Sequence, residues 1–87
     1  MDKYLSLFPD GIDHESKVPK FQQIEYVLKK AIEEGRLQKN SKLPSIRHLS
    51  QAFLISKQTT ERAYWRLKKQ GYLCHSKGKG YFVAPLN

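Results

Sequence analysis

The side chains best suited to chemistry are four polar ones in a row, Ser56, Lys57, Gln58 and Thr59. Ser56 is a favoured N-cap residue, and the sequence after it predicts a helix to about Gln70. At a helix N-terminus the free backbone N–H groups favour phosphate, and the first side chains can enter a DNA major groove. Gln58 can pair with adenine, and Lys57 with guanine or phosphate. Ser56 is expected both to cap and to touch phosphate, whereas capping alone explains Thr59 equally well.

The same predicted helix continues with charged side chains that can meet DNA. Arg62 and Arg66 lie four residues apart and can follow the sugar-phosphate backbone. Glu61 is the single acid in residues 36–87. It can accept a hydrogen bond from cytosine N4, or it can form a local salt bridge to Lys57 or Arg62. Both interpretations of Glu61 are open at this point.

Basic side chains in two other segments also suit phosphate contacts. Arg47 lies near the start of another predicted helix, where it can clamp a phosphate or form a surface ion pair. Lys77 and Lys79 flank Gly78 in a loop and can contact phosphate or the minor groove. Gly78 and Gly80 permit a tight turn. A plain hairpin turn would explain these glycines but not the lysines beside them.

Apolar spacing predicts the first helix of the chain. The helical pattern starts at Val18, with Pro19 in the first turn, where its missing N–H leaves no bond unmade. Gly35 stands where a glycine commonly ends a helix. The predicted apolar stripe consists of Phe21, Ile24, Val27, Leu28, Ala31 and Ile32.

Two further helices are predicted close together. One begins after the N-cap candidate Ser45 and ends near Phe53, and a two-residue apolar turn, Leu54–Ile55, leads to the helix that follows Ser56. This order is the helix-turn-helix arrangement. The expected inward residues are Ile46, Leu49, Ala52 and Phe53 in the first of the pair, and Thr60, Ala63, Tyr64 and Leu67 in the second. Trp65 is out of phase, so we expect it to be partly exposed and to pack on another segment or copy rather than on DNA.

Residues 72–75 and 81–83 predict two short strands, joined by the loop 76–80, and Lys42–Leu43 can add a very short third strand. A hairpin after a helix-turn-helix is a wing. The expected fold class is therefore mainly α with a small β-hairpin (α+β), a winged helix-turn-helix of three helices and a two- to three-stranded wing.

Charge is divided unevenly along these 87 residues, a length that suits one small domain. Residues 1–35 carry five lysines and arginines against seven acids, whereas residues 36–87 carry eleven against one. Nucleic acid is the commonest partner of such a basic segment, and a merely solvated basic surface is the alternative.

Several other classes of protein are disfavoured. The longest apolar run, residues 52–55, is far too short to cross a membrane, and one cysteine excludes an intrachain disulfide. The three histidines and Cys74 are dispersed, and no Ser-His-Asp set, carboxylate pair or cofactor loop is present. We therefore expect no enzyme, cofactor, metal or membrane partner. The expected location is the cytoplasm, on the nucleoid when the protein is bound to DNA.

Six sequence blocks in order resemble the N-terminal winged-helix domain of GntR-type bacterial transcription regulators. The blocks are PKFQQI (19–24), GRL (35–37), LPSIRHL (43–49), SKQTT (56–60), GYL (71–73) and GKGYFV (78–83). The resemblance covers about residues 12–84 and is greatest to the branch with YtrA-type repressors and MocR-type fusions. It implies DNA binding, with Arg47 on the DNA backbone. Many family members have arginine where this chain has Glu61.

The expected layout is an N-terminal arm at 1–16, a winged helix-turn-helix domain at 17–84 and a tail at 85–87. The arm carries scattered apolar residues and can dock on the domain or on a second copy, or it can be a disordered tail. YtrA-type proteins have a C-terminal helical segment for dimerisation and effector response. Since this sequence stops at Asn87, we expect that segment to be truncated here or absent from the protein.

The predicted function is a sequence-specific bacterial transcription regulator that acts as a repressor. Two copies are expected to bind a pseudo-palindromic DNA operator as a homodimer, and the residues do not identify a small-molecule effector. The alternatives are a winged-helix protein-interaction module or an RNA-binding module. The deep, narrow major groove of A-form RNA suits a reading helix less well than DNA does.

Overall fold

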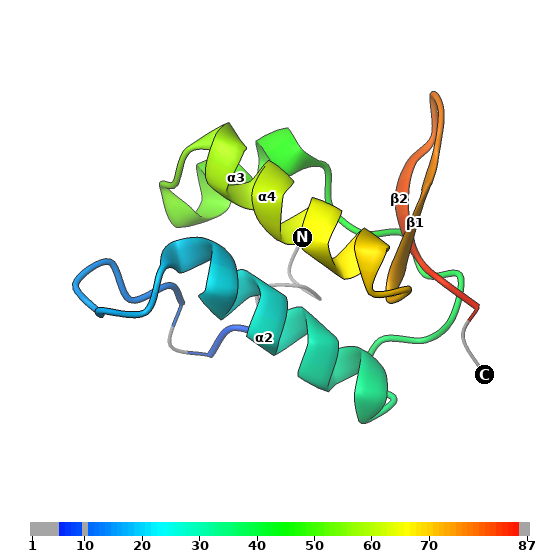
Figure 1. The fold of residues 1–87 in the computed structure, drawn as a ribbon, viewed down its shortest axis with the longest axis horizontal. Helices are drawn as coiled ribbons and strands as arrows, with labels where there is room; N and C mark the ends of the chain where they lie inside the picture. The colour runs from blue at the N-terminus through cyan, green and yellow to red at the C-terminus, as the bar shows by residue number, and fades with distance from the viewer. Residues whose placement is uncertain (1–5, 10, 86–87) are drawn as a thin grey trace.

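The computed structural model describes residues 6–9 and 11–85. Residues 1–5 and 10 of the predicted arm, and residues 86–87 of the predicted tail, lie outside the described residues. Three helices, α2 (Lys20–Glu33), α3 (Ile46–Phe53) and α4 (Lys57–Lys69), are followed by strands β1 (Leu73–Ser76) and β2 (Gly80–Val83). Figure 1 shows α2 and α4 side by side, with the hairpin standing at the C-terminal end of α4. The expected fold class, mainly helical with a small hairpin, is confirmed.

Helix α2 begins at Lys20, two residues later than the sequence pattern predicts. Pro19 is the N-cap, with φ −54° and ψ 144°, and its carbonyl accepts hydrogen bonds from the backbone N–H groups of Gln22 and Gln23. Because this conformation is extended, Pro19 precedes the helix rather than lying in its first turn. Gly35 has φ +79° and follows the helix as predicted, in a conformation that is unstrained for glycine.

Helix α3 has the predicted N-cap but a different inward face. The Ser45 side chain accepts a hydrogen bond from the backbone N–H of His48. Ala52 is exposed, so its prediction as an inward residue is wrong. Ser50 is buried instead, because its hydroxyl donates to Thr60 Oγ1 of α4 at 2.8 Å. A buried hydroxyl is tolerated when it is paired in this way.

Helix α4 follows the prediction closely. Ser56 is its N-cap, and the predicted stripe of Thr60, Ala63, Tyr64 and Leu67 is buried. The Tyr64 hydroxyl donates to the Pro44 carbonyl at 2.8 Å, which ties the helix to the start of α3. Burial of this stripe leaves the opposite face of α4 in solvent.

Strands β1 and β2 form an antiparallel hairpin in which Leu73 pairs with Val83 and Ser76 with Gly80. The predicted third strand is reduced to one bridge, between Lys42 and Phe82. The backbone N–H of Leu43 donates to the Tyr81 carbonyl at 2.9 Å, so the segment before α3 holds the base of the wing.

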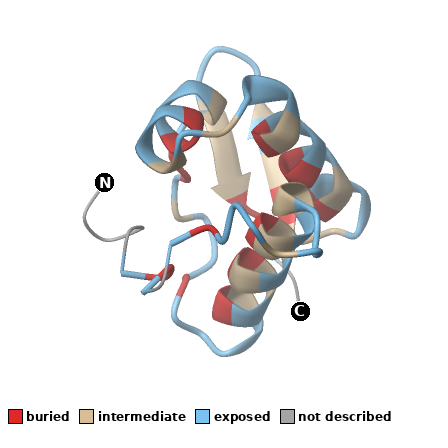
Figure 2. Cartoon of the chain, turned by 90° about the vertical axis from the view of Figure 1, so that its left-hand side faces the viewer, coloured by how far each residue is buried: buried red, intermediate tan, exposed pale blue. Residues whose placement is uncertain are grey.

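The described part of the N-terminal arm packs on the domain. Leu7, Phe8 and Ile12 belong to the buried core cluster. The ring of Phe8 lies 4.8 Å from that of Phe53, and the His14 ring donates through Nε2 to the Phe53 carbonyl at 3.0 Å. Figure 2 shows buried positions on the arm as well as on the inward faces of the helices. Among the described residues, no helix is both long and apolar enough to span a membrane.

Candidate nucleic-acid interface

The first turn of α4 places its polar residues beside a capped N-terminus. Ser56 Oγ accepts from the Thr59 backbone N–H at 3.1 Å, and the hydroxyls of Ser56 and Thr59 share a hydrogen bond of 2.8 Å. Both hydroxyls therefore take part in capping. Lys57 and Gln58 are exposed and hydrogen-bond to no described side chain, so their polar groups are available to a ligand.

Glu61 is exposed on α4 and forms no ion pair with a described residue. The local salt bridge that the sequence leaves open is therefore not formed. Arg62 is held elsewhere, because its guanidinium lies 4.2 Å from the ring centre of Phe21 on α2. A cation over an aromatic face is attracted by the ring quadrupole.

A shallow groove joins the outward face of α4 to the wing. It is lined by Gln58, Glu61, Arg62 and Trp65 of α4 and by Tyr81 of β2. Trp65 is 55% exposed, as its phase in the helix predicts, and the Lys69 ammonium lies 4.6 Å from its ring centre. Candidate reading residues and strand β2 of the wing therefore border the same space.

Arg66 has a partner within the domain. Its Nε donates to Glu25 Oε1 of α2 at 2.7 Å, and Gln70 Nε2 donates to Glu25 Oε2 at 2.6 Å. Burial by itself raises the pKa of the Glu25 carboxyl. The hydrogen bonds from Arg66 and Gln70, with the charges of Arg66 and Lys29, outweigh that effect and leave the pKa below its ordinary value. Glu25 thus cancels much of the charge that Arg66 could offer to phosphate.

Arg47 and the wing lysines are free cations on the surface. Arg47, Lys77 and Lys79 are exposed and form no ion pair with a described residue. Gly78 has φ +80°, and the Lys79 backbone N–H donates to the Ser76 carbonyl at 2.9 Å to close the turn. The hairpin tip projects away from the helices (Figure 1). The wing therefore presents two lysines on a tight turn.

Most of the basic second half of the chain remains unpaired. Among the described residues, only Arg36 and Arg66 of the eleven lysines and arginines in 36–87 contact a carboxylate. The salt bridges of the domain otherwise involve Lys30 of α2. An unneutralised surface of this kind attracts polyanions.

Phe21, Glu25 and Ser50 support the interface and were not predicted to do so. Phe21 was expected only in the apolar stripe of α2, but its ring also carries Arg62. Each of these contacts joins residues that are far apart in sequence, and periodicity on one helix gives no signal for them. Only for Ser50 does the sequence contain a signal, because a polar residue inside an otherwise apolar helix face indicates a buried hydrogen-bond partner.

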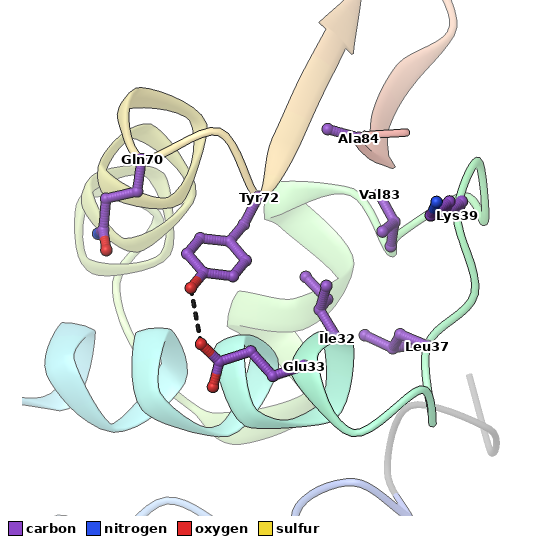
Figure 3. A pocket seen from close by; sticks show the side chains of 8 residues that line it. All are labelled: Ile32, Glu33, Leu37, Lys39, Gln70, Tyr72, Val83 and Ala84. Carbon is purple, nitrogen blue, oxygen red and sulfur yellow. Dashed lines mark hydrogen bonds between the residues drawn. The ribbon is translucent and has the colours of Figure 1, made fainter. Parts of the chain in front are cut away.

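A second concavity lies at the other end of α4, away from Ser56. Figure 3 shows it between the end of α2 and the base of the hairpin, with Ile32, Leu37 and Val83 on its apolar side. The Tyr72 hydroxyl donates to Glu33 Oε2 at 2.7 Å. That hydrogen bond, with smaller effects of burial and of the Glu33 charge, raises the pKa of Tyr72. None of the predicted DNA-contacting residues lines this pocket.

Two helices joined by a short turn, with a basic hairpin after them, define a winged helix-turn-helix protein. The chain belongs to the family described as "Bacterial regulatory proteins, gntR family", whose family model matches residues 20–83. The resemblance to GntR-type regulators is therefore confirmed. Members of this family are transcription regulators, which agrees with the expectation that the chain is not an enzyme.

Three known proteins illustrate the similarity. The repressor NagR of Bacillus subtilis (strain 168) is 38% identical over 74 residues, which is 85% of this chain and 30% of NagR. The structure of YtrA from Sulfolobus acidocaldarius has a TM-score of 0.80 and 33% identity, and the match covers 87% of this chain and 80% of that one. The structure of AraR(DBD) in complex with operator ORX1 has a TM-score of 0.73 and 31% identity, over 83% of this chain and 89% of that one.

The match to longer relatives is confined to a part of them. The chain spans between 14% and 30% of the length of three curated relatives that are 37–40% identical to it. The similarity therefore describes the winged-helix domain of these proteins.

Proposed function

We propose that this chain is the DNA-binding domain of a transcription regulator and that it binds operator DNA sequence-specifically, to repress transcription. The observation that carries the proposal is the groove shared by α4 and β2, where Gln58 and Glu61 stand exposed. The unpaired cations around it supply attraction to phosphate. The similarity to AraR(DBD) bound to its operator, and to the repressor NagR, supports this role.

The proposed contacts are divided between positioning and reading. Arg47, Arg62 and the wing lysines bind phosphates, which sets the register of the domain on the duplex. Gln58 and Lys57 at the start of α4 meet base edges. Arg66 contributes less, since Glu25 pairs with it. The full proposed set is Arg47, Ser56, Lys57, Gln58, Thr59, Glu61, Arg62, Arg66, Lys77, Gly78 and Lys79.

We further propose that two copies occupy a pseudo-palindromic operator, because a two-fold arrangement of the protein matches two half-sites on the duplex. In this proposal, residues 17–84 are the binding domain, 1–16 an arm and 85–87 the tail. The proposed location is the cytoplasm, where operator DNA is found in bacteria.

The salt dependence of duplex binding tests the proposal. Log K should fall linearly with log salt, by about 0.9 for each phosphate contact. Lys77→Ala combined with Lys79→Ala should weaken binding to all duplexes and make the slope shallower by about 1 to 2. Lys30→Ala is the matched control, because Lys30 lies on α2 and pairs with Glu34.

The same titration distinguishes the alternatives. Single-stranded DNA and duplex RNA should bind more weakly than duplex DNA at every salt concentration. Tighter binding to duplex RNA, or no binding to any nucleic acid, would contradict the proposal in favour of an RNA-binding or a protein-interaction module.

A further inference from the structure

Glu61 stands out as an acid on a face that is otherwise basic. It is the single acid in residues 36–87, and it is exposed beside Gln58 in the groove between α4 and β2. Lys57 and Arg62 are the cations nearest to it in sequence, yet neither forms a salt bridge with it, and Arg62 rests on Phe21 instead. The carboxylate therefore keeps its charge unneutralised by the described residues.

The walls of the groove make an unpaired carboxylate costly once DNA covers it. Trp65 and Tyr81 contribute aromatic surface on either side of this space. A duplex lying against α4 and the wing would displace water from the groove. A carboxylate that loses its water must gain another hydrogen-bond donor, or binding is weakened. Phosphate oxygens cannot provide one, because they only accept.

Base edges differ in whether they can supply that donor. In the major groove guanine presents the acceptors N7 and O6, and thymine presents the acceptor O4. Adenine presents a donor beside an acceptor, whereas cytosine presents its N4 amino donor alone. A carboxylate is therefore matched best by cytosine, and it repels guanine and thymine, which adds specificity by exclusion.

We propose that Glu61 is a specificity-determining residue whose carboxylate accepts a hydrogen bond from the N4 amino group of a cytosine in each operator half-site. The proposal rests on the proposed function, and it adds which base pair is read at this position. It predicts a C·G pair at one fixed place in the half-site, with G and T excluded there.

Selection from a random duplex library identifies the base pair concerned. The wild-type chain should select one position as C·G, and Glu61→Gln should change that position to A·T, because glutamine pairs with adenine through both its donor and its acceptor. Glu34→Gln, which removes one negative charge from outside α4, should leave every position unchanged. The other positions of the half-site should be the same in all three proteins.

A chemical deletion on the DNA tests the contact itself. Replacing the selected cytosine with a pyrimidin-2-one nucleotide removes the N4 amino group. Wild-type affinity should then fall about tenfold, within the range for a good base contact. Glu61→Ala should change less than about twofold between the two duplexes, since the contact is already absent. Melting curves of the exposed-site variants should match that of the wild type.

The outcomes separate this proposal from the function on which it rests. The role of Glu61 is overturned, while DNA binding stands, if Glu61→Gln selects the same sequence as the wild type. It is also overturned if the wild type and Glu61→Ala lose the same affinity on the duplex that lacks the N4 amino group. Failure of the wild-type chain to bind any duplex overturns the proposed function as well.

Discussion

The guanidinium of Arg66 and the carboxylate of Glu25 join α4 to α2, with 2.7 Å between Nε and Oε1. Arg62, one turn earlier on α4, has no carboxylate partner and lies over the Phe21 ring. These two arginines lie on one side of the same helix, but only the charge of Arg62 is left without a carboxylate partner and can attract DNA phosphate. The domain uses Arg66 mainly to hold its helices together, whereas Arg62, over the Phe21 ring, keeps a charge that no described carboxylate neutralises.

This difference predicts distinct effects of Arg62→Ala and Arg66→Ala. Arg62→Ala should weaken duplex binding and lower the salt slope by about 0.9 if one phosphate contact is lost. Arg66→Ala should lower the melting temperature by a few degrees with a smaller effect on the slope, since it breaks an interhelix pair. Fluorescence anisotropy at several salt concentrations and thermal melting measure the two effects. If the salt slope changed equally in both variants, the assignment of the phosphate contact to Arg62 and of the interhelix pair to Arg66 would be contradicted.

The backbone conformation of Leu54, in the turn of the helix-turn-helix, predicts that a substitution there stabilises the domain. It has φ 55° and ψ 47°, a left-handed conformation that is strained for leucine, and its side chain is 83% exposed. Leu54→Gly should therefore raise the free energy of unfolding by about 0.5–1 kcal/mol, the strain relieved less the greater unfolded-state entropy of glycine. Leu54→Ala keeps the Cβ atom and should bring no such gain. Denaturant unfolding of the wild type, Leu54→Gly and Leu54→Ala measures these differences in the free energy of unfolding.

The lowered pKa of Glu25 predicts a pH dependence of stability. Because the folded-state pKa lies below the ordinary value of about 4.5, the stabilisation is fully present above that pH. It is lost as the pH falls through the folded-state pKa. Glu25→Gln should lower the melting temperature at pH 7, and its difference from the wild type should shrink below about pH 4.5. Glu15→Gln, at an exposed position of the arm, serves as the control and should follow the wild type at both pH values.

The buried pair of Ser50 and Thr60 predicts coupling between the two helices of the motif. Ser50→Ala alone should cost about 1–2 kcal/mol, because it leaves the buried Thr60 hydroxyl without its donor. Thr60→Val alone should cost less, because the Ser50 hydroxyl keeps the Ser56 carbonyl at 3.4 Å as an acceptor. The double variant should cost less than the sum of the two, since no unpaired group then remains. Strictly additive losses in a denaturant double-mutant cycle would show that the hydroxyls act independently.

Much of the local structure was predictable because it depends on neighbouring residues. Ser45 and Ser56 cap helices with their own side chains, and Gly35 ends α2, as their residue types predict. The stripe of α4 was predicted correctly since a long amphipathic helix repeats its pattern over several turns. In the short α3 the pattern failed at Ala52, because there the partner of Ser50 on α4 decides which side faces inward.

The sequence by itself determined the order of the elements, the basic second half and the family, since each depends on residues close together along the chain. Tertiary structure alone decided which charges are free. Glu25 occupies Arg66 from another helix, Phe21 carries Arg62, and Glu61 is left without a partner beside the wing. The physical reason is that ion pairing and groove formation require groups distant in sequence to meet. Local propensity and periodicity, which act over a few residues, contain no information on such encounters.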